Sequence, residues 1–506
     1  MERDLARLSD TVHDVIVVGG GIHGACIAWD AALRGLRVAL LERDDFGGAT
    51  SANSLRIVHG GLRYLARGDW RRMRESVRER SALLRIAPTL VEPLPVLVPT
   101  SGAGTQSRLA LGSGIALNDL LTLDRNRGLD ADHRLARGRL LSLADCRRRF
   151  PAFPTAEATG GALWYDARLR HPERLTLAFV RSAMARGAVA ANHCRFEEVL
   201  VSNGEVRGVK ATDTLSGETV EARGRTVMVA AGPWTGALAE PGRRAGPQAF
   251  ALNLVIDRSL GNAAVGARAH SGVDRDPIIG GHRFIFLVPQ GETTLLGTWY
   301  ALDDGREPGQ LIAEGTAALL GEFQTAFPAL ALDQTDVLRC QWGRLPLRGG
   351  REPGRADALA DRPVLTDHGA SGGIRGMYSV EGVKFTTARH VAERAVDRIV
   401  TALGEAVDRC RTAETRVDAG EGQEGARVGG QSVLHAVRAE MAVTLSDVVF
   451  RRIGSGAPPE PAAETVAEAA GIAAEELGWT TARRDAEIED VMRQLKPGGS
   501  FSRPLA

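Results

Sequence analysis

The segment DVIVVGGGIHGACIAWDAALRGLRVALLE, residues 14–42, determines how the rest of the chain is interpreted. Residues 15–18 form a short run of β-branched side chains, which is typical of a buried parallel strand. The run leads into GGGIHG at 19–24, which fits the pattern G-x-G-x-x-G. A helix rich in small residues is predicted over 25–33, and a second apolar strand over 38–41. Strand, glycine turn, helix and strand in this order predict a βαβ unit.

Each glycine of this motif has a physical role in a dinucleotide site. Gly19 makes the tight turn, Gly21 lets the backbone approach a pyrophosphate, and Gly24 lets the helix pack closely on the sheet. The helix N-terminus offers N–H groups to phosphate oxygens, and Glu42 is placed to accept the ribose hydroxyls. The segment therefore predicts a dinucleotide-binding domain, but it leaves the choice between NAD and FAD open.

Bulk composition is that of an ordinary globular protein, with 44% hydrophobic and 25% charged residues. A length of 506 residues predicts about two to four domains. The formal net charge of +1 gives no electrostatic reason to expect nucleic acid as a partner. The cysteines number 5 and form no C-x-x-C pair, so we expect a reducing compartment, no disulfide framework and no metal site.

Membrane and targeting signals are weak in this sequence. No apolar run of about 18 residues occurs, so no spanning helix is expected. The dinucleotide strand begins at residue 15 and the preceding leader is charged, so no cleavable signal peptide is expected either. We therefore expect a cytoplasmic protein, peripheral at most on the inner face of the cell membrane.

The segment after Glu42 is rich in turns and in groups that could bind phosphate oxygens. Thr50 and Ser51 supply hydroxyls directly after the second strand, although an exposed loop with a helix cap is the alternative. Farther on, Gly60-Gly61 would let a flat ligand approach the backbone, with His59 on one side and Arg63 on the other.

Asp69 is predicted to cap a helix with apolar residues at helical spacing from Trp70 to Leu84. We interpret the other face of this helix as solvated, and a membrane-surface helix is the alternative. That other face carries Arg71, Arg72, Arg74, Arg78 and Arg85.

Strand-like alternation over 196–230 predicts a β-meander with turns at Asn203-Gly204 and Ser216-Gly217. Residues 246–345 are predicted to be mostly β with helical inserts. A helix is expected over 388–403, with Thr386 or Thr387 as its N-cap.

The C-terminal part is predicted to be helical. Val437, Met441, Leu445 and Val448 are expected to lie in one helix, and further helices are expected near 462–476 and 483–495.

Five further motifs follow the glycine motif in order: ATS at 49–51, HGGLRYL at 59–65, YDARL at 165–169, AAGPW at 230–234 and GVKFTTAR at 382–389. Together they resemble the FAD-dependent glycerol-3-phosphate dehydrogenase/oxidase family, which has a D-amino-acid-oxidase-like flavoprotein fold. The segments EMAVTLSDVVFRR at 440–452 and ELGW at 476–479 are similar to the appended helical domain of that family. The resemblance implies bound FAD, oxidation of the C2 hydroxyl of sn-glycerol 3-phosphate to dihydroxyacetone phosphate, and quinone or oxygen as electron acceptor.

The resemblance also implies an α/β architecture with three parts: a Rossmann-like FAD-binding domain, a substrate domain with a mixed β-sheet, and a C-terminal helical domain. Peripheral membrane contact and a homodimer are kept as open alternatives. The predicted boundaries are 1–90, 161–245 and 340–410 for the FAD-binding domain, 91–160 and 246–339 for the substrate domain, 411–431 for a linker, and 432–506 for the helical domain.

The predicted cofactor contacts come from the glycine motif, the loop after the second strand, and the HGG, AAG and GVKFT segments. They are Gly19, Gly21, Ile22, His23, Gly24, Glu42, Arg43, Thr50, Ser51, Arg56, His59, Gly60, Gly61, Ala231, Gly232, Gly382, Val383, Lys384, Phe385 and Thr386.

Oxidation of an alcohol needs a base, positive charge near the reduced cofactor and an anchor for the phosphate. His59 is the predicted base, because its ordinary pKa of about 6.5 suits proton acceptance, although a structural histidine is the alternative. Arg63 with Tyr64 is the predicted phosphate clamp, because a guanidinium binds phosphate in a bidentate fork.

Lys384 is predicted to act on substrate or cofactor. It is one of three lysines, with Lys210 and Lys496, in a chain that contains 63 lysines and arginines, so a retained ammonium at this place suggests a role. Arg344 is also predicted to be catalytic and substrate-binding, as a substitute for an arginine that the family carries one position farther on.

Three departures from the family pattern lie in the substrate half. The family's G-V-R-P-L appears as GRLPL at 343–347, a Lys-Gly-Ser-His segment is replaced near 253–259, and Gly-Thr-Thr-Asp appears as GTWY at 297–300. FAD is therefore a firmer prediction than glycerol 3-phosphate. Another anionic hydroxy acid, polyol phosphate or amine is the main alternative, followed by a non-catalytic flavin- or nucleotide-binding regulator and an NAD-dependent dehydrogenase.

Overall fold

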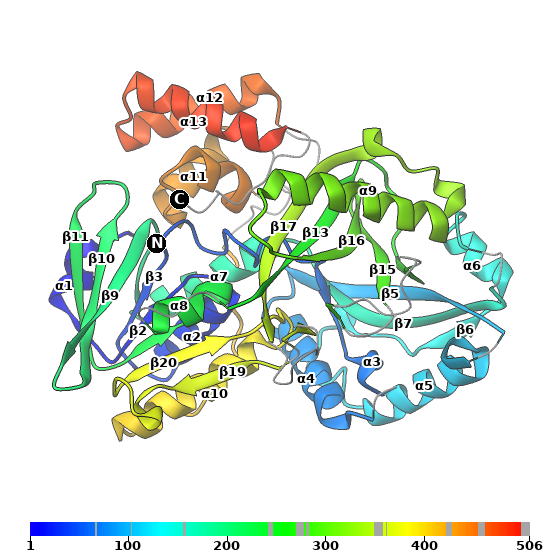
Figure 1. Ribbon diagram of the computed structural model, residues 1–506, viewed down its shortest axis with the longest axis horizontal. Helices are drawn as coiled ribbons and strands as arrows, with labels where there is room; N and C mark the ends of the chain where they lie inside the picture. The colour runs from blue at the N-terminus through cyan, green and yellow to red at the C-terminus, as the bar shows by residue number, and fades with distance from the viewer. Residues whose placement is uncertain are drawn as a thin grey trace.

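The computed structural model describes residues 1–65, 68–102, 104–154, 158–240, 246–269, 278–279, 283–348, 358–360, 362–420, 428–453 and 461–496. Of Arg63, it describes only the backbone. Two sheet-based halves lie side by side, and a cluster of C-terminal helices sits on one of them (Figure 1).

A six-stranded sheet among the described residues forms the centre of the first half. Its order is β19-β20-β12-β2-β3-β8, and every neighbouring pair is parallel except β19 with β20. The predicted βαβ unit is confirmed, with its helix α2 beginning at Ile22. The bounds are β2 Val15–Val18, α2 Ile22–Leu33, β3 Val38–Leu41, β8 Val189–Ala191, β12 Val227–Val229, β19 Val364–Asp367 and β20 Met377–Glu381.

The four residues of β2 are buried on both faces of this sheet. Val15 and Val17 pack against helices, whereas Ile16 and Val18 pack against a β-meander on the opposite face. A parallel strand covered on both sides needs an unbroken apolar run, which explains the sequence of β2.

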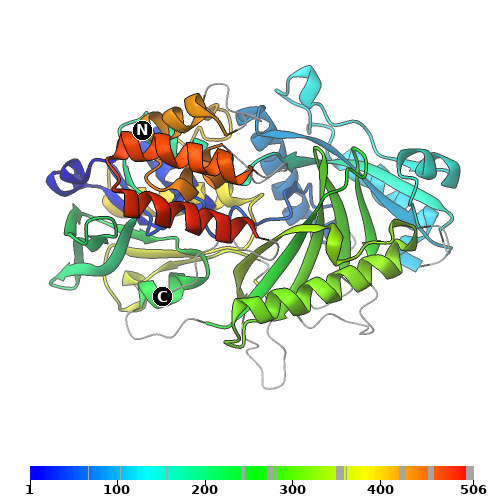
Figure 2. The same cartoon turned by 90° about the horizontal axis from the view of Figure 1, so that it is seen from above.

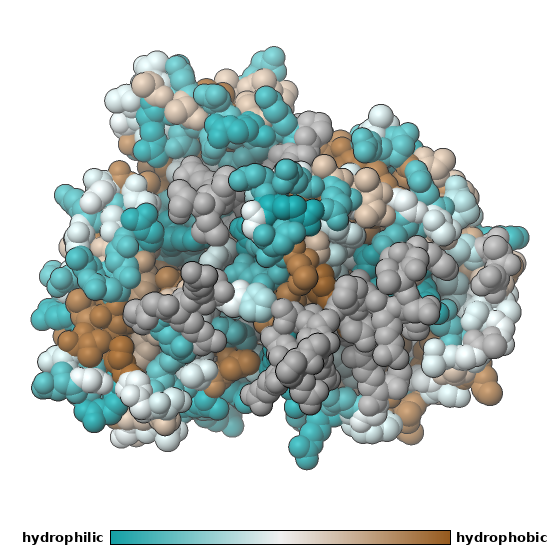
Figure 3. Space-filling model, viewed as in Figure 1, coloured by the Kyte–Doolittle hydropathy of each residue, from teal (hydrophilic) through white to brown (hydrophobic). Residues whose placement is uncertain are grey.

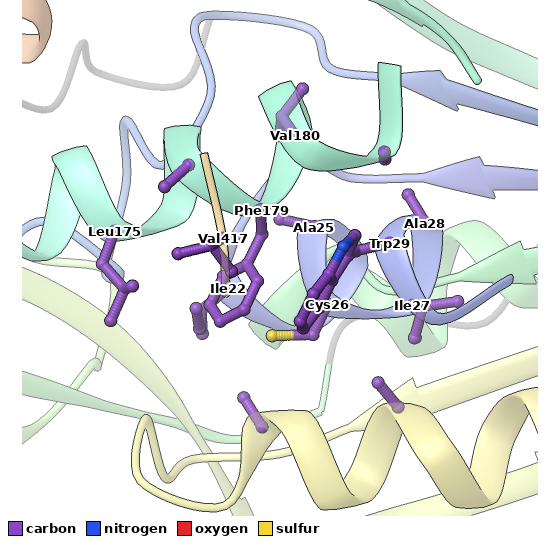
Figure 4. Close-up of a cluster of buried hydrophobic side chains, with 14 of the residues drawn as sticks. Ile22, Ala25, Cys26, Ile27, Ala28, Trp29, Leu175, Phe179, Val180 and Val417 are labelled. Carbon is purple, nitrogen blue, oxygen red and sulfur yellow. The ribbon is translucent and has the colours of Figure 1, made fainter. Parts of the chain in front are cut away.

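Three helices cover the helical face: α2, α7 (Pro172–Met184) and α10 (Ala388–Leu403). Trp29 of α2 and Phe179 of α7 meet with ring centroids 5.3 Å apart, and Figure 4 shows the two side chains next to each other. The bounds of α10 agree with the predicted helix over 388–403, and its N-cap is Thr387, one of the two predicted.

The opposite face is covered by the predicted meander, in which β1 (Val12–His13) joins β9 (Cys194–Ser202), β10 (Glu205–Asp213) and β11 (Thr219–Gly224). The predicted turn at Asn203-Gly204 is confirmed, since φ is +53° and +74° at these two residues. Positive φ at both central positions is the geometry that joins two-residue hairpins.

The second half is built on a ten-stranded sheet in the described ranges, and α9 (Pro308–Ala326) packs on it. Its order is β18-β17-β13-β16-β15-β14-β5-β7-β4, with β6 paired to β7. The bounds are β4 Ile57–Val58, β5 Val91–Thr100, β6 Arg139–Leu141, β7 Gly160–Leu169, β13 Gln248–Ile256, β14 Ala264–Arg268, β15 Phe284–Gln290, β16 Thr293–Leu302, β17 Val337–Arg348 and β18 Ala358–Leu359.

Several segments assigned by sequence to the FAD-binding domain belong to this large sheet, namely β4, β18 and the two long strands β7 and β17. Residues 161–169 lie in β7, which pairs with β5 along its full length, and residues 340–348 lie in β17, which pairs with β13. These strands are the places where the chain passes between the two halves, so their sheet membership depends on distant partners.

The remaining helices of the described part connect these layers. They are α1 Leu5–Asp10, α3 Leu62–Leu65, α4 Trp70–Ile86, α5 Arg108–Leu121, α6 Leu143–Arg149 and α8 Thr235–Ala239. Asp69 caps α4 as predicted, since its carboxylate accepts the N–H of Arg72. No helix within the described ranges is both long and apolar enough to cross a membrane.

The C-terminal helices α11 (Gly430–Glu440), α12 (Ala463–Leu477) and α13 (Thr481–Leu495) lie over the first half, as seen from above in Figure 2. The prediction of one helix through Val437 and Val448 is wrong. Met441 has a φ of +58° and ends α11, and a π-helical segment follows at Asp447–Arg452. The carboxylate of Asp447 holds the break by accepting the N–H groups of residues 443 and 444.

Buried charges attach these helices to the first half. Arg452 forms two bonds to Asp45, of 2.5 and 2.8 Å, and both side chains are about 1% exposed. Arg174 likewise forms two bonds to Glu440, of 2.6 and 2.8 Å. Because unpaired charges at such depth would be costly, the pairs specify where the C-terminal helices sit.

The first part of the predicted linker is also packed. Val417 donates its N–H to the carbonyl of Ile86, and Asp418 pairs with Arg181 of α7. Residues 411–420 therefore follow the surface of the first half, while residues 421–427 of the predicted linker lie outside the described residues.

A third buried pair makes the junction sensitive to pH. His193 Nε2 lies 3.0 Å from Asp447 Oδ2. Burial alone would lower the pKa of His193, but the Asp447 carboxylate more than offsets it and the pKa is raised. Burial opposes the charged form of Asp447 too, yet His193 and Arg452 hold the pKa of Asp447 well below its ordinary value.

We predict that replacing His193 by glutamine lowers the free energy of unfolding more at about pH 5.5 than at about pH 9. Because the pKa of His193 is higher in the folded protein than in the unfolded chain, the charged imidazole stabilises the fold. This stabilisation is complete below pH about 6.5, the pKa in the unfolded chain, and is lost as the pH rises through the pKa in the folded protein. The ionised carboxylate of Asp447 stabilises the fold above about pH 4, and this stabilisation is lost as the pH falls and the carboxylate is protonated. Urea unfolding of both proteins across this range checks the prediction, and an equal or larger difference at high pH would contradict it.

Candidate active site

The glycine motif forms a tight cradle between β2 and α2. Gly19 has a φ of +104°, and a Cβ there would lie 2.7 Å from the carbonyl oxygen of Ala230. A Cβ on Gly24 would lie 1.8 Å from the carbonyl oxygen of Gly19. Neither position can carry a side chain, so backbone surrounds the space at the helix N-terminus. Ala231 adjoins this space, because its Cα would lie 3.0 Å from the same Gly19 Cβ.

The loop after β3 packs against this cradle. Ser51 Oγ accepts the N–H of Ile22 at 3.0 Å, and Gly47 donates its N–H to the carbonyl of Gly20 at 3.0 Å. Gly21 is the N-cap of α2 and has no side chain of its own with which to cap the helix. The first turn of α2 therefore faces the Thr50–Ser51 segment, as a pyrophosphate site requires.

Glu42 stands at the end of β3, as predicted for a ribose-binding acid. Its carboxylate accepts the N–H of Gly20 at 2.6 Å and the N–H of Asp44 at 3.0 Å. Burial and the neighbouring Asp44 carboxylate raise the pKa of Glu42. The guanidinium of Arg43 lies 4.6 Å from the ring centroid of Trp234, which brings the AAGPW motif to the same end of the sheet.

We predict that Gly24→Ala abolishes retention of a dinucleotide and lowers the free energy of unfolding by more than about 3 kcal/mol, because backbone cannot move aside as a flexible side chain can. Gly471→Ala is the matched control, since a Cβ at that helical position of α12 meets nothing within 4 Å. The control is expected to be neutral or stabilising by up to about 1 kcal/mol. Flavin absorbance of the purified proteins and chemical unfolding check both, and a G24A protein that retains flavin would contradict the prediction.

The buried carboxylate of Asp166 supports the HGG segment. Gly60 donates its N–H to Asp166 Oδ1 at 2.6 Å, and Arg80 pairs with the same oxygen at 2.6 Å. Trp164 Nε1 donates to the other oxygen at 3.0 Å. A Cβ on Gly60 would lie 2.1 Å from the Arg80 guanidinium, so glycine is needed for this close approach.

Asp166 and Arg80 were not predicted as site residues. Asp166 belongs to the YDARL motif. An acidic residue inside a strand of otherwise buried residues needs a partner, and this signal could have identified Asp166 as part of the site. Arg80 carried no such signal, because one more arginine on α4 is indistinguishable by sequence from those on the solvated face.

Tyr64 is the point at which the predicted active-site residues meet. It is 2% exposed, and its ring centroid lies 5.9 Å from that of His59. Lys384 Nζ lies 5.0 Å from the Tyr64 ring centroid, and the Arg72 guanidinium lies 5.4 Å from it. Two segments more than three hundred residues apart, HGGLRYL and GVKFTT, are therefore adjacent. The side chain of Arg63 lies outside the described residues.

The GVKFTT segment also touches the glycine motif. A Cβ on Gly382 would lie 2.5 Å from His23 Nε2, so the imidazole rests directly against this backbone. Burial lowers the pKa of His23 to about 4, which keeps the ring neutral at physiological pH. Phe385 packs on the core of the first half and Thr386 is buried, whereas Val383 is partly exposed.

Two predicted arginines have other contacts. Arg344 forms an ion pair with Asp303, its guanidinium lies 5.5 Å from the Trp342 ring centroid, and its carbonyl accepts the Thr50 hydroxyl at 2.9 Å. The guanidinium of Arg56 donates to the carbonyl of Arg170 at 3.0 Å and to Gln290 at 3.1 Å. Thr50 thus lies against β17, while the predicted catalytic role of Arg344 and the cofactor role of Arg56 stay predictions.

A narrow cleft opens where the loop after β3, strand β17 and the C-terminal helices meet. It is lined on one side by Arg43, Thr50 and Trp234, and on the other by Asp447 and Arg451. The C-terminal helices therefore form one wall of the space beside the predicted cofactor loop.

Comparison with known proteins is consistent with this geometry. The family described as "FAD dependent oxidoreductase" matches residues 14–404, and the family described as "C-terminal domain of alpha-glycerophosphate oxidase" matches residues 340–484. A glycerol-3-phosphate dehydrogenase from Synechocystis is 30% identical over 427 residues, which cover 81% of this chain and 74% of the relative. Glycerol-3-phosphate dehydrogenase 1 from Mycobacterium tuberculosis is 34% identical over 430 residues, covering 81% and 77%.

Among solved structures, glycerol-3-phosphate dehydrogenase from Bacillus halodurans, complexed with FAD, superposes with a TM-score of 0.74 at 23% sequence identity. The match covers 99% of this chain and 98% of that chain. It shows that the two chains share a fold from end to end, including the C-terminal helices.

Proposed function

We propose a reaction for this chain from the premise that it belongs to the FAD-dependent oxidoreductase family and, within it, to the glycerol-3-phosphate dehydrogenases. FAD is its cofactor. The reaction is oxidation of the C2 hydroxyl of sn-glycerol 3-phosphate to dihydroxyacetone phosphate, with hydride transfer to FAD.

The residues of the first half fit the ADP part of FAD. Glycine backbone is packed closely at the N-terminus of α2, and Ser51 and Thr50 line the facing loop. Glu42 offers a partly exposed carboxylate at the end of β3, where ribose hydroxyls would donate. When bound, FAD supplies the acceptor for the hydride that leaves the substrate carbon.

His59 is assigned the removal of the hydroxyl proton, because an imidazole beside the active-site tyrosine can accept a proton near neutral pH. Lys384 contributes a positive charge at the same tyrosine, which favours the negative charge that the substrate oxygen carries once its proton has been removed. These assignments rest on adjacency to Tyr64, since both residues lie next to its ring.

Arg63 and Tyr64 are proposed to bind the substrate phosphate, with Arg344 as a further candidate. Arg72 adds a further positive charge near Tyr64, because its guanidinium lies 5.4 Å from the ring centroid. A doubly charged phosphate is favoured where several cations converge on one desolvated group.

The single observation that supports this proposal most is the approach of Lys384 to Tyr64, because it brings the two most family-specific motifs into one site. Anaerobic titration of the purified yellow protein with glycerol 3-phosphate tests the proposal. Loss of the flavin absorbance band on addition of substrate is expected. Flavin that stays oxidised with glycerol 3-phosphate but is reduced by another phosphorylated polyol would remove this substrate.

A second substrate remains a candidate: another anionic hydroxy acid, polyol phosphate or amine. The observation that favours it concerns Asn253, which replaces part of a family segment. Its side-chain N–H donates to the carbonyl of Asn53 at 3.0 Å, and its side-chain oxygen accepts the Thr298 hydroxyl at 2.7 Å. Both polar groups of Asn253 are therefore used in contacts within the protein rather than offered to a substrate. The same titration with a panel of anionic alcohols and amines separates the two candidates.

For the surroundings of the reaction, we propose quinone or oxygen as electron acceptor and a cytoplasmic location with peripheral contact to the inner face of the cell membrane. A homodimer is the proposed assembly. Steady-state reduction of a soluble quinone against oxygen uptake distinguishes the acceptors, and light scattering of the purified protein gives the assembly.

A further inference from the structure

The carboxylate of Asp166 accepts hydrogen bonds from three parts of the chain. Its Oδ1 accepts the N–H of Gly60 at 2.6 Å and a bond from Arg80 Nη1 of α4, also at 2.6 Å. Its Oδ2 accepts the indole N–H of Trp164 at 3.0 Å. Trp164 and Asp166 lie on the same face of β7, because they are two residues apart in a strand. One carboxylate therefore joins the HGG turn, helix α4 and strand β7.

This cluster lies inside the protein. Charged side chains are normally found at the surface, and Figure 3 shows hydrophilic residues spread over one face of the molecule. Asp166, however, is 6% exposed and Arg80 is 3% exposed, whereas Arg71 and Arg78 of α4 are exposed, as predicted for its solvated face. A buried ion pair contributes little net stability, because desolvation offsets the attraction, so a role in fixing local geometry explains the pair better.

The bond to Gly60 orients the peptide group that follows His59. The N–H of Gly60 and the carbonyl of His59 belong to one planar group, so an N–H directed at Asp166 also sets the orientation of the His59 backbone. Gly60 rests directly against Arg80 as well, since a Cβ on Gly60 would lie 2.1 Å from the guanidinium. The peptide between His59 and Gly60 is therefore held against both charged groups.

Tyr64 has anchors of its own. Its ring packs with Met73 and Val77 of α4 and is buried. The Tyr64 side of the turn thus depends on α4, whereas the His59 side depends on Asp166. The placement of His59, whose ring centroid lies 5.9 Å from that of Tyr64, is therefore set by the carboxylate.

We propose that Asp166 is a positioning residue for the oxidation, because its carboxylate holds His59 in the orientation that removes the hydroxyl proton. This inference rests on the proposed function, in which His59 is the base. Asp166 acts through the Gly60 peptide rather than on the substrate. A displacement of about 1 Å can cost about a hundredfold in rate, so an indirect contact of this kind can affect turnover strongly.

Only a carboxylate can accept all three bonds. An ionised carboxylate accepts at both oxygens, whereas the amide of asparagine accepts at one atom and donates at the other. The variant D166N can place its amide oxygen toward Gly60 and Arg80. Its amide nitrogen would then face the indole N–H of Trp164, so that two donors meet. Replacing Trp164 by phenylalanine removes this conflict.

Anaerobic stopped-flow reduction of the FAD-loaded enzyme by glycerol 3-phosphate tests the proposal. D166N is expected to lower the limiting rate of flavin reduction by about tenfold to a hundredfold. The apparent Kd for substrate should change by less than about twofold, because Tyr64 keeps its anchors. The double variant D166N/W164F is expected to be at least about threefold faster than D166N, since the two substitutions are coupled through one contact.

Hydrogen exchange gives a second readout, which does not depend on turnover. The amide of Gly60 should exchange at least about tenfold faster in D166N than in the wild type, and D166N/W164F should restore part of the protection. Mass spectrometry of fragments that span Gly60 measures this exchange.

Asp213→Asn is the matched control. Asp213 is also buried, and its Oδ1 accepts the N–H of Leu215 at 3.1 Å and pairs with Arg3 at 2.6 Å. Its Oδ2 accepts the hydroxyl of Ser216 at 2.8 Å. The same pattern of donors thus occurs in the meander, and D213N should keep the wild-type rates of flavin reduction and of exchange at Gly60.

A D166N enzyme with the wild-type limiting rate would overturn the proposal. A D166N/W164F enzyme no faster than D166N would do the same, because relief of the conflict with the indole would then be irrelevant. If D166N does not retain FAD, Arg80→Lys decides in its place. An ammonium does not reproduce the planar guanidinium, so a limiting rate at least about threefold lower is expected, and a wild-type rate would overturn the proposal.

Failure of the proposed reaction would be seen separately, as wild-type flavin that glycerol 3-phosphate does not reduce. The variants are then compared with the anionic alcohol that does reduce the flavin, because Asp166 acts on His59 whichever alcohol is oxidised. Wild-type flavin that no alcohol reduces would remove both the reaction and this role of Asp166.

Discussion

Replacing Lys384 by methionine is expected to lower kcat/KM for glycerol 3-phosphate by about a hundredfold to a thousandfold while FAD stays bound. The side chain keeps its length but loses the ammonium that lies 5.0 Å from the Tyr64 ring centroid. Removing one positive charge from a site in which negative charge develops costs about this much in enzymes that stabilise oxyanions. Stopped-flow reduction of the bound flavin measures the effect on the chemical step directly.

Lys210→Met is the matched control for this variant. Lys210 is on β10 and its ammonium lies 3.7 Å from the exposed Glu198, so its removal should leave turnover unchanged. Lys384→Arg retains the charge but changes its shape, and partial activity is expected because a planar guanidinium does not replace a compact ammonium. Full activity of Lys384→Met would remove Lys384 from the mechanism.

Replacing Arg452 by methionine is expected to lower the free energy of unfolding by about 3–5 kcal/mol, since Asp45 would be left as a buried charge without its principal partner. Asp45 is 2% exposed, and its other partners are the Asn192 side-chain amide at 2.9 Å and the more distant guanidinium of Arg451, whose Nε lies 4.0 Å away. Urea unfolding followed by flavin fluorescence and by far-ultraviolet circular dichroism reports cofactor release and loss of structure separately.

Arg438→Met is the matched control, because Arg438 pairs with Glu476 on the exposed surface of the same helices. Little or no change in the free energy of unfolding is expected there, because solvent screens this pair. The double variant D45L/R452M should regain much of the lost stability, because replacing both buried charges removes the unpaired carboxylate. An Arg452→Met protein as stable as Arg438→Met would show that the buried pair does not secure the junction.

The first half of the fold could be predicted closely because its signals are local. The run Val15–Val18 and the glycine turn specify β2 and α2 within a few neighbouring residues. The bounds of α10 were likewise predictable from periodicity and a threonine cap. Such features depend on dihedral preferences and on burial, which are encoded within one or two turns of chain.

The large sheet and the C-terminal junction depend on distant partners. Strand β7 pairs with β5, and the paired residues are about seventy positions apart in the sequence. Nothing within residues 161–169 specifies that partner. The end of α11 at Met441 depends on Asp447 and on packing against the first half, whereas the apolar spacing continues across the break. Periodicity therefore predicted a longer helix than the tertiary structure allows.

The candidate site divides in the same way. Motifs such as HGGLRYL and GVKFTT could be assigned to one site through family resemblance, and their adjacency at Tyr64 is a property of the fold. The support of Gly60 by Asp166 and Arg80 could not be derived from either motif alone, because it requires three segments to meet.

The bond between Asp45 and Arg452 joins residues 407 positions apart, and this has a consequence for synthesis of the chain. At about 5–20 residues per second, a ribosome needs about 20–80 s to reach Arg452 after Asp45 has been made. During that interval the nascent nucleotide-binding unit carries a carboxylate whose final counter-ion does not yet exist. The bond from Arg452 to Asp45 can therefore form only near the end of synthesis, and truncation before Arg452 should leave the loop after β3 without it.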